Sequence, residues 1–184
     1  MNLDYDLQQL SIGEKPLILV GLMGCGKSTI GKMLGRALSI PFFDSDDEIE
    51  KASGRSISEV FAEFGEEEFR RGELKVISRI LSGPQCILAT GGGAFVQEET
   101  RNIIKEKGVS VWLKADLDIL MERVLRKNTR PLLQTDDPRA VMEKLIKERY
   151  PLYEKADYIF QTEETSKENV LHGVLDLLSK KGNA

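Results

Sequence analysis

Lysine and arginine number 26 and aspartate and glutamate 30 in a chain of 184 residues, so the formal net charge is −4, and 41% of the residues are hydrophobic. This size and mixture are typical of a globular domain that buries its own core, and residues 1–184 are interpreted as a single domain. The acidic balance argues against a nucleic-acid partner. No apolar run approaches the roughly 18 residues of a membrane-spanning helix, which argues against a membrane partner.

The start of the chain and its cysteines indicate a cytoplasmic protein. Residues 1–15 have neither the basic start nor the apolar core of a signal peptide, and we expect a loose lead-in to the fold. Cys25 and Cys86 form no metal-ligand pattern, so both are expected as reduced thiols in the cytoplasm. We expect a monomer.

Short apolar runs alternate with longer helical patterns along the chain. Predicted strands cover residues 17–20, 42–44, 86–89, 109–113 and 158–160. The first, third and fourth are nearly continuous apolar runs, as expected for strands that are covered on both faces. Apolar residues at helical spacing fill residues 30–38, 117–125 and 170–178. This alternation predicts an α/β fold in which a parallel sheet lies between two layers of helices.

Helix boundaries can be read from side-chain types. Ser56 with Glu59 three residues later forms a capping-box pattern, and Gly65 can end the short helix that follows. Asp137 precedes a proline that suits a first helical turn, and Ser166 can cap the last helix.

The segment after the first predicted strand matches the phosphate-binding loop of nucleotide-binding proteins. It runs from Gly21 to a Gly-Lys-Ser end at Ser28, and the strand before it and the helix after it argue against a chance glycine-rich turn. Glycines let backbone N–H groups approach phosphate oxygens, Lys27 adds a positive charge, and the Ser28 hydroxyl can ligate Mg²⁺. The expected nucleotide-binding residues of this loop are Gly24, Cys25, Gly26, Lys27, Ser28 and Thr29.

The phosphate loop alone does not decide what happens to the phosphate. A GTPase would need an Asn-Lys-x-Asp stretch and an Asp-x-x-Gly switch, and neither stands where it should. A motor or transporter ATPase usually has a larger chain. A small enzyme with a second substrate beside the γ-phosphate is therefore favoured.

Two acidic residues at the end of the second predicted strand are candidates for the chemistry. Asp44 and Asp46 are two residues apart, so on an extended chain their side chains would point to the same side, roughly 6–7 Å apart. Asp44 could then serve the water shell of Mg²⁺ while Asp46 faces an acceptor hydroxyl. The alternative is an acidic strand end and helix cap, because Asp47, Glu48 and Glu50 follow.

An arginine and a glycine run are candidates for binding the second substrate. Arg70 could pair with a carboxylate through two hydrogen bonds, although it could equally lie on a solvated helix face beside residues 66–68. Three glycines at residues 91–93 follow the third predicted strand, at the edge where open parallel sheets bind ligands. A simple turn would explain one or two glycines more readily than three.

A basic, polar segment at about residues 125–138 is interpreted as a lid between two helices. A lid excludes water and can bring an arginine, here Arg130, to the developing charge. Arg149 lies near the end of the next helical pattern. Arg70, Arg130 and Arg149 could converge only through the fold.

Taken together, these motifs resemble those of the shikimate kinase family, over about residues 17–160. The resemblance rests on the order and spacing of Gly21 to Ser28, Asp44-Ser45-Asp46, Phe69-Arg70-Arg71, Gly91-Gly92-Gly93, Arg130-Pro131-Leu132-Leu133 and Arg149 ahead of Pro151-Leu152-Tyr153. It implies the P-loop fold of the nucleoside monophosphate kinases, a three-layer α/β/α fold with a five-stranded parallel sheet, a lid and a helical substrate-binding subdomain.

The resemblance also implies roles for the acceptor side. Asp46 would hold ring hydroxyls of shikimate and act as the base toward the attacking one. Arg70 and Arg149 would bind the carboxylate, and Gly92 and Gly93 would donate backbone contacts. The apolar wall would be formed by Ile57, Phe61 and Phe69.

On the nucleotide side, the resemblance implies that Arg123 packs against adenine and that Arg130 reaches ATP with the lid. Lys27 would act on the phosphates, and Asp44 would support Mg²⁺ beside Ser28. The implied reaction is transfer of the γ-phosphoryl group of MgATP to the 3-hydroxyl of shikimate, in aromatic amino-acid biosynthesis. The alternatives are a kinase for another small polyol or sugar acid, such as gluconate, and a nucleotide-binding regulator without activity.

Overall fold

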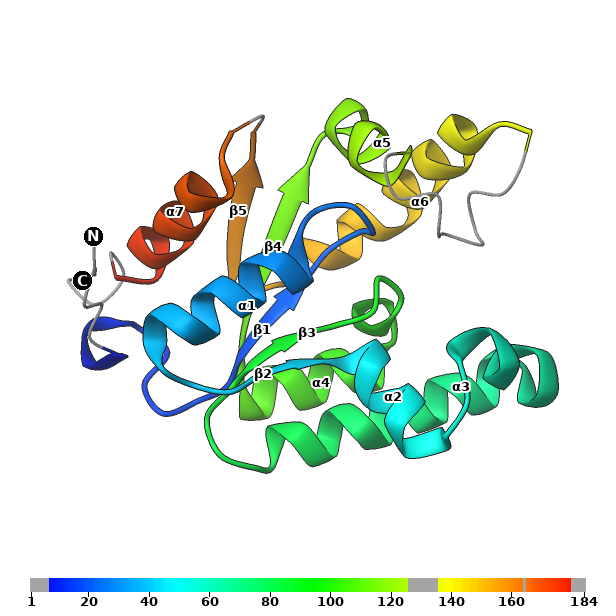
Figure 1. Cartoon of the computed structure of the whole chain (residues 1–184), viewed down its shortest axis with the longest axis horizontal. Helices are drawn as coiled ribbons and strands as arrows, with labels where there is room; N and C mark the ends of the chain where they lie inside the picture. The colour runs from blue at the N-terminus through cyan, green and yellow to red at the C-terminus, as the bar shows by residue number, and fades with distance from the viewer. Residues whose placement is uncertain (1–6, 126–135, 164, 180–184) are drawn as a thin grey trace.

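The structure is a computed structural model that describes residues 7–125, 136–163 and 165–179. Within these ranges a sheet of five strands has the order β2-β3-β1-β4-β5 (Figure 1). The strands are β1 Leu17–Val20, β2 Phe42–Asp44, β3 Ile87–Ala89, β4 Val109–Ala115 and β5 Tyr158–Thr162. Every neighbouring pair is parallel, which confirms the predicted α/β class.

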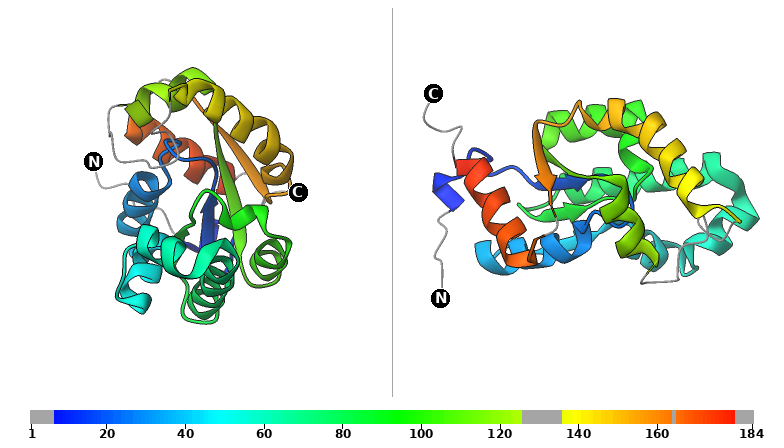
Figure 2. Two further views of the ribbon diagram at one scale, coloured as in Figure 1. Left: turned by 90° about the vertical axis from the view of Figure 1, so that its right-hand side faces the viewer. Right: turned by 90° about the horizontal axis from the view of Figure 1, so that it is seen from above.

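Helices cover both faces of the sheet. Their bounds are α1 Lys27–Leu38, α2 Ser45–Ser53, α3 Ile57–Leu81, α4 Glu98–Lys107, α5 Leu117–Leu125, α6 Pro138–Tyr153 and α7 Lys167–Ser179, with short 3₁₀ helices η1 Leu7–Gln9 and η2 Ala94–Val96. Helices α1 and α7 pack together on one face, and α3 and α4 pack together on the other (Figure 2). In the described part of the chain, no helix combines the length and apolar character that a bilayer crossing needs.

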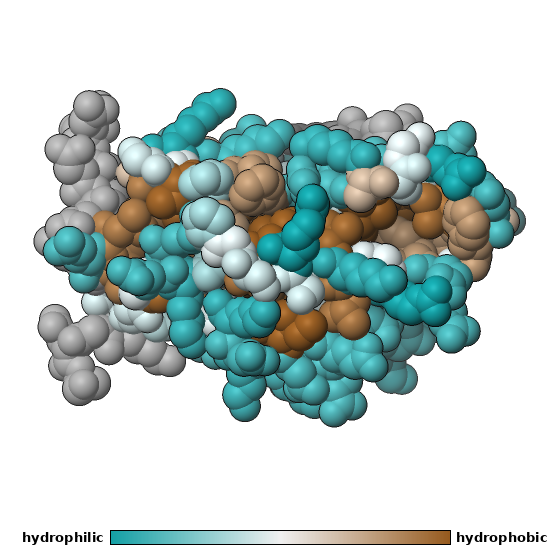
Figure 3. Space-filling model, turned by 90° about the horizontal axis from the view of Figure 1, so that it is seen from below, coloured by the Kyte–Doolittle hydropathy of each residue, from teal (hydrophilic) through white to brown (hydrophobic). Residues whose placement is uncertain are grey.

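The apolar runs of the sequence occupy the centre of the sheet. All four residues of β1 are 0% exposed, and so is Trp112 on β4. A strand without polar alternation suits a position covered on both faces, whereas the edge strand β5 alternates buried and exposed residues. On the outside, seen from below in the view of Figure 1, hydrophilic side chains cover most of the surface and apolar side chains show between them (Figure 3).

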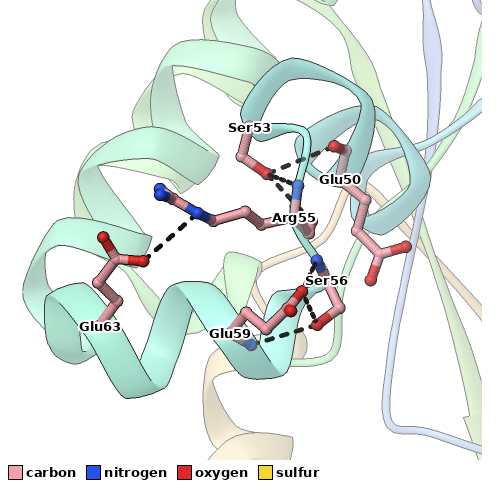
Figure 4. A network of polar contacts seen from close by, with 6 residues as sticks. All are labelled: Glu50, Ser53, Arg55, Ser56, Glu59 and Glu63. Atoms are coloured by element: carbon pink, nitrogen blue, oxygen red, sulfur yellow. Dashed lines mark hydrogen bonds and ion pairs between the residues drawn. The ribbon is translucent and has the colours of Figure 1, made fainter.

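The predicted capping box starts α3 and fixes the corner between α2 and α3. The Ser56 hydroxyl accepts from the Glu59 amide at 3.3 Å, and the Glu59 carboxylate accepts from the Ser56 amide at 2.7 Å (Figure 4). Arg55 adds an ion pair to Glu63 at 3.3 Å across the same corner. The helical subdomain formed by α2 and α3 is thus held by local contacts.

Gly65 interrupts α3, which agrees with the prediction that it can end the short helix after Ser56. Its φ of 78° and ψ of 176° are not helical, and the helix resumes after this kink and continues to Leu81. A positive φ is strained for residues with a side chain, so glycine suits this position. The two parts of α3 therefore point in different directions.

Two further predicted caps are confirmed. Asp137 accepts from the Ala140 amide at 3.0 Å to start α6, and Ser166 accepts from the Asn169 amide at 3.1 Å before α7. The expected lid at about 125–138 lies for the most part outside the described residues.

The interpretation of the lead-in as loose is wrong for its described part. Leu10 and Ile12 are buried in the core, and the Ser11 amide donates to the Leu178 carbonyl at 3.0 Å. The physical reason is that the two apolar side chains join the hydrophobic core, a long-range packing that no local pattern reveals.

Candidate active site

The loops after β1, β2 and β3 border one cleft of about 420 Å³. These strands are neighbours in the sheet and run in parallel, so their carboxyl ends meet at one edge. The predicted site residues that line the cleft are Gly24, Cys25, Gly26, Lys27, Ser28, Thr29, Asp44, Asp46, Gly92 and Arg123. The three motifs that seemed separate in the sequence thus share one space.

The phosphate loop leads directly into α1, which begins at Lys27. Gly24 and Gly26 have φ angles of 85° and 101°, in the left-handed region that favours glycine. Gly26 is the N-cap of α1 and has no side chain to satisfy the first helical amides, so these amides and the positive end of the helix dipole suit an anion.

Lys27 is folded back over its own loop. It is 9% exposed, and its Nζ donates to the carbonyls of Gly21 at 2.7 Å and Leu22 at 2.9 Å. The thiol of Cys25 lies 3.6 Å from the same nitrogen. These contacts keep a buried ammonium satisfied, and they place it beside the backbone that would surround a phosphate.

Ser28 and Asp44 bring two oxygen groups together at the cleft. The Ser28 hydroxyl donates to Asp44 Oδ2 at 2.6 Å, and Asp44 Oδ1 accepts from the Asp46 amide at 3.1 Å. A hydroxyl and a carboxylate are ligands that suit Mg²⁺, which is usually held by one or two carboxylates together with phosphates and water. The residues present therefore fit a magnesium ion bound with a nucleotide.

The predicted geometry of Asp44 and Asp46 on one extended segment is wrong. The strand ends at Asp44, which is the N-cap of α2, and Asp46 lies in the first turn of that helix. The helix forms here because the Asp44 carboxylate satisfies a free amide of the first turn. Both side chains still line the cleft.

Each of the three glycines after β3 lies against a different part of the site. A Cβ atom at Gly91 would lie 2.7 Å from Asp46 Oδ1, and one at Gly93 would lie 2.4 Å from Arg70 Nη2. At Gly92 it would lie 3.5 Å from Arg149 Nη1. A side chain at Gly91 or Gly93 would therefore displace a polar group of the site, whereas one at Gly92 would make ordinary contacts.

Arg70 faces the site and is not on a solvated helix surface. Its guanidinium donates to Glu73 Oε2 at 2.7 Å and is 19% exposed, whereas Arg71 is 63% exposed and pairs with Glu68. Glu73 itself is 1% exposed. Two buried atoms of this pair, Arg70 Nε and Glu73 Oε1, have no hydrogen-bond partner among the described residues.

Glu73 was not predicted as a site residue, although it lies at a helical i, i+3 spacing from Arg70. Burial raises the pKa of its carboxyl above the ordinary value, and the Arg70 guanidinium only partly opposes this. Arg70 nevertheless holds the Glu73 carboxylate at 2.7 Å, and Glu73 fixes the guanidinium in return.

Arg149 reaches the same glycine run from α6. Its Nη1 donates to the Gly92 carbonyl at 3.1 Å. Arg70 and Arg149, far apart in the sequence, thus both reach the glycine run, Arg149 at Gly92 and Arg70 at Gly93. Arg130, the third arginine, lies outside the described residues.

The predicted apolar wall forms a cluster on α3 that does not line the cleft itself. The rings of Phe61 and Phe69 are 4.3 Å apart, and Ile57 packs against the core nearby. The Arg70 guanidinium carbon lies 5.1 Å from the Phe69 ring centre. This cluster therefore supports the position of Arg70.

Three lining residues on the nucleotide side were not predicted. Thr165, Lys167 and Val170 come from the start of α7 and its preceding loop, and they line the cleft together with Arg123 from α5. The sequence carried no motif for them, because their position depends only on where α7 packs.

Known proteins share this arrangement. A family model described as shikimate kinase matches residues 23–179. The chain belongs to the shikimate kinase family. A shikimate kinase of Caulobacter vibrioides is 51% identical over 164 residues, which cover 89% of this chain and 82% of that relative.

Solved structures agree with the family assignment. A shikimate kinase from Acinetobacter baumannii in complex with shikimate has a TM-score of 0.87 and 35% identity, over 93% of this chain and 96% of that one. A gluconokinase from Sinorhizobium meliloti has a TM-score of 0.65 at 16% identity, over 91% and 93% of the two chains. The second likeness shows the fold alone. Both confirm the predicted P-loop kinase fold.

Proposed function

We propose that this chain transfers the γ-phosphoryl group of MgATP to the 3-hydroxyl of shikimate, giving shikimate 3-phosphate and ADP in aromatic amino-acid biosynthesis. The observation that supports this most is the meeting of Arg70 and Arg149 at the glycine run, directly beside the phosphate loop. Two guanidinium groups suit a carboxylate, and Asp46 at the same edge suits a hydroxyl. The family assignment points to the same substrate.

On the donor side, Lys27 would exchange its carbonyl partners for the β- and γ-phosphates of the bound nucleotide. Ser28 and Asp44 would hold Mg²⁺, which would neutralise charge on those phosphates. Arg123, with the residues at the start of α7, would contact the base. Arg130 would join the phosphates from the lid, as the family resemblance implies.

On the acceptor side, the substrate oxygen would attack the γ-phosphorus while the bond to the bridging β,γ-oxygen breaks. Asp46 would take the proton of the attacking hydroxyl. Arg70 and Arg149 would hold the carboxylate, helped by backbone amides of Gly92 and Gly93. The protein thus acts mostly by positioning and by stabilising charge.

The test is a coupled assay of ADP release with MgATP and shikimate, with gluconate, or with no acceptor. ADP release that depends on shikimate supports the proposal. Release with gluconate alone would indicate a sugar-acid kinase, and nucleotide binding without turnover would indicate a regulator. We further propose a cytoplasmic monomer, which size-exclusion chromatography with light scattering tests for its oligomeric state.

A further inference from the structure

The carbonyl of Gly92 accepts two hydrogen bonds from α6. Arg149 Nη1 donates to it at 3.1 Å, and the Tyr153 hydroxyl donates to it as well. The neighbouring carbonyls of the glycine run accept from backbone amides in the following 3₁₀ turn, at 3.1 Å each. The middle carbonyl alone is bound by side chains, and both come from one distant helix.

Tyr153 is built into the core as a fixed donor. It is 0% exposed, and its ring lies 5.7 Å from that of Trp112 and 6.3 Å from that of Phe95. Burial raises the pKa of its hydroxyl far above the ordinary value, so the hydroxyl keeps its proton at neutral pH. Packing on several sides leaves the ring little freedom to turn away from Gly92.

A hydrogen bond to the Gly92 carbonyl also fixes the amide of Gly93. The two groups belong to one planar peptide unit, and in a trans peptide they point in opposite directions. Donors on the carbonyl also polarise the amide N–H at the other end of the unit. Among the described residues, neither the Gly92 nor the Gly93 amide has a protein acceptor, so both can donate to a ligand.

We propose that Tyr153 is a positioning residue for the acceptor substrate. Its hydroxyl and Arg149 together fix the plane of the Gly92–Gly93 peptide, so that the Gly93 amide and the Arg149 guanidinium are ready for the substrate carboxylate. Without the hydroxyl, Arg149 is the only described side chain that still donates to this carbonyl. This inference rests on the proposed function, because it takes shikimate as the ligand.

The chain offers a matched control on the same helix. The hydroxyl of Tyr150 also donates to a backbone carbonyl, that of Ala115, and burial raises its pKa to about 12. Its ring packs edge-on against Trp112 at 4.8 Å. Tyr150→Phe thus removes the same kind of buried hydrogen bond as Tyr153→Phe, but one that does not reach the glycine run.

The experiment measures the dissociation constants of shikimate and ADP by calorimetry, with the melting temperature of each variant. We expect Tyr153→Phe to weaken shikimate binding about five- to tenfold and to change ADP binding less than about twofold, the scale of one lost hydrogen bond. Tyr150→Phe should leave both dissociation constants unchanged. It should lower the melting temperature by about as much as Tyr153→Phe does.

A double-mutant cycle with Arg149→Ala tests whether the two donors act together. Because both hold one carbonyl, their effects on shikimate binding should not be additive. Equal weakening of ADP binding, additive effects, or a Tyr153→Phe variant that matches Tyr150→Phe would overturn the role of Tyr153. A wild-type chain that binds ADP but not shikimate would instead contradict the proposed function, and this inference with it.

Discussion

Asp46 and Lys27 lie in different surroundings at the edge of the sheet. Asp46 lies in the first turn of α2 beside the glycine run, and Lys27 lies across the phosphate loop. The first would act on the acceptor and the second on the donor. Substitutions at the two positions should therefore separate turnover from nucleotide binding.

Asp46→Asn is expected to lower kcat by roughly 100-fold or more, the usual contribution of a general base. The affinity for ATP should change less than about twofold, because the backbone amide of residue 46, which donates to Asp44, is kept. Steady-state kinetics and nucleotide titration measure the two effects. The exposed neighbour offers a control, since Asp47→Asn should change neither. Equal losses of turnover and ATP affinity would contradict the role of Asp46 as base.

Cys86 should make the fold sensitive to alkaline pH. It is 1% exposed, and burial raises the pKa of its thiol from 9.0 to about 11. The unfolded chain loses this proton above about pH 9 while the folded chain keeps it, so the free energy of unfolding is unaffected below pH 9 and falls as the pH rises toward 11. Between pH 8 and 10 the wild type should lose about 1 kcal/mol more than Cys86→Ala.

Denaturant titrations at several pH values measure this difference. Cys86→Ala leaves a cavity, which lowers the stability at every pH, so the informative quantity is the slope against pH and not the absolute value. Parallel slopes for the two proteins would show that the thiol ionises equally in the folded and unfolded chains.

At the scale of single elements, helix α3 contains two glycines whose backbone conformations differ. Gly65 has a φ of 78° at the kink, whereas Gly72 has a helical backbone. A Cβ atom at either position would meet nothing within 4 Å. Only the backbone conformation distinguishes them.

Gly72→Ala is therefore expected to stabilise the protein by about 0.5–1 kcal/mol, because alanine has the better helix propensity. Gly65→Ala should destabilise it by about 1 kcal/mol or more, because alanine is strained at a positive φ. Thermal unfolding of the two variants measures the contrast. A loss of stability in Gly72→Ala would show that the open space beside residue 72 is needed.

The elements could be predicted closely where local chemistry decides them. The apolar run of β1 and the capping box at Ser56 are visible in the sequence, and the structure confirms both. The helix start at Asp44 was one of two alternatives, because an acidic strand end and a helix start look alike until the Asp44 cap is seen. Strand β4 runs on to Ala115, past the predicted end, because pairing with β5 extends it.

The candidate site could be predicted as a set of residues but not as an arrangement. The meeting of Arg70 with Gly93, and of Arg149 with Gly92, depends on the packing of α3 and α6. Buried partners such as Glu73 carry no motif of their own. Residues that a family motif fixes can be named from the sequence, whereas those chosen by packing require the fold.

At the scale of the whole molecule, ligand binding should stabilise the fold, because the site joins loops from three strands to helices α5, α6 and α7. A ligand at 100 times its dissociation constant adds about 2.7 kcal/mol to the free energy of unfolding. For a chain of this size that corresponds to a rise of roughly 5–10 °C in the melting temperature. Shikimate and ADP should each produce such a rise.

Arg70→Lys should separate the two ligands. Lysine keeps a positive charge beside the buried Glu73 but loses the planar fork that suits a carboxylate. The variant should therefore need at least about tenfold more shikimate for the same rise, and its response to ADP should be unchanged. Thermal-shift titrations measure both, and an unchanged shikimate response would remove Arg70 from the acceptor site.

The contact between the glycine run and the phosphate loop bears on inhibitor design. A Cβ atom at Gly92 would lie 3.7 Å from both the Gly21 carbonyl oxygen and the Met23 amide, so the two loops meet backbone to backbone. With no side chain between them, one molecule that joins a nucleotide mimic to a carboxylate-bearing ring would need only a short linker. Such a compound would place its two parts on the two loops, the nucleotide mimic at the phosphate loop and the carboxylate at the glycine run.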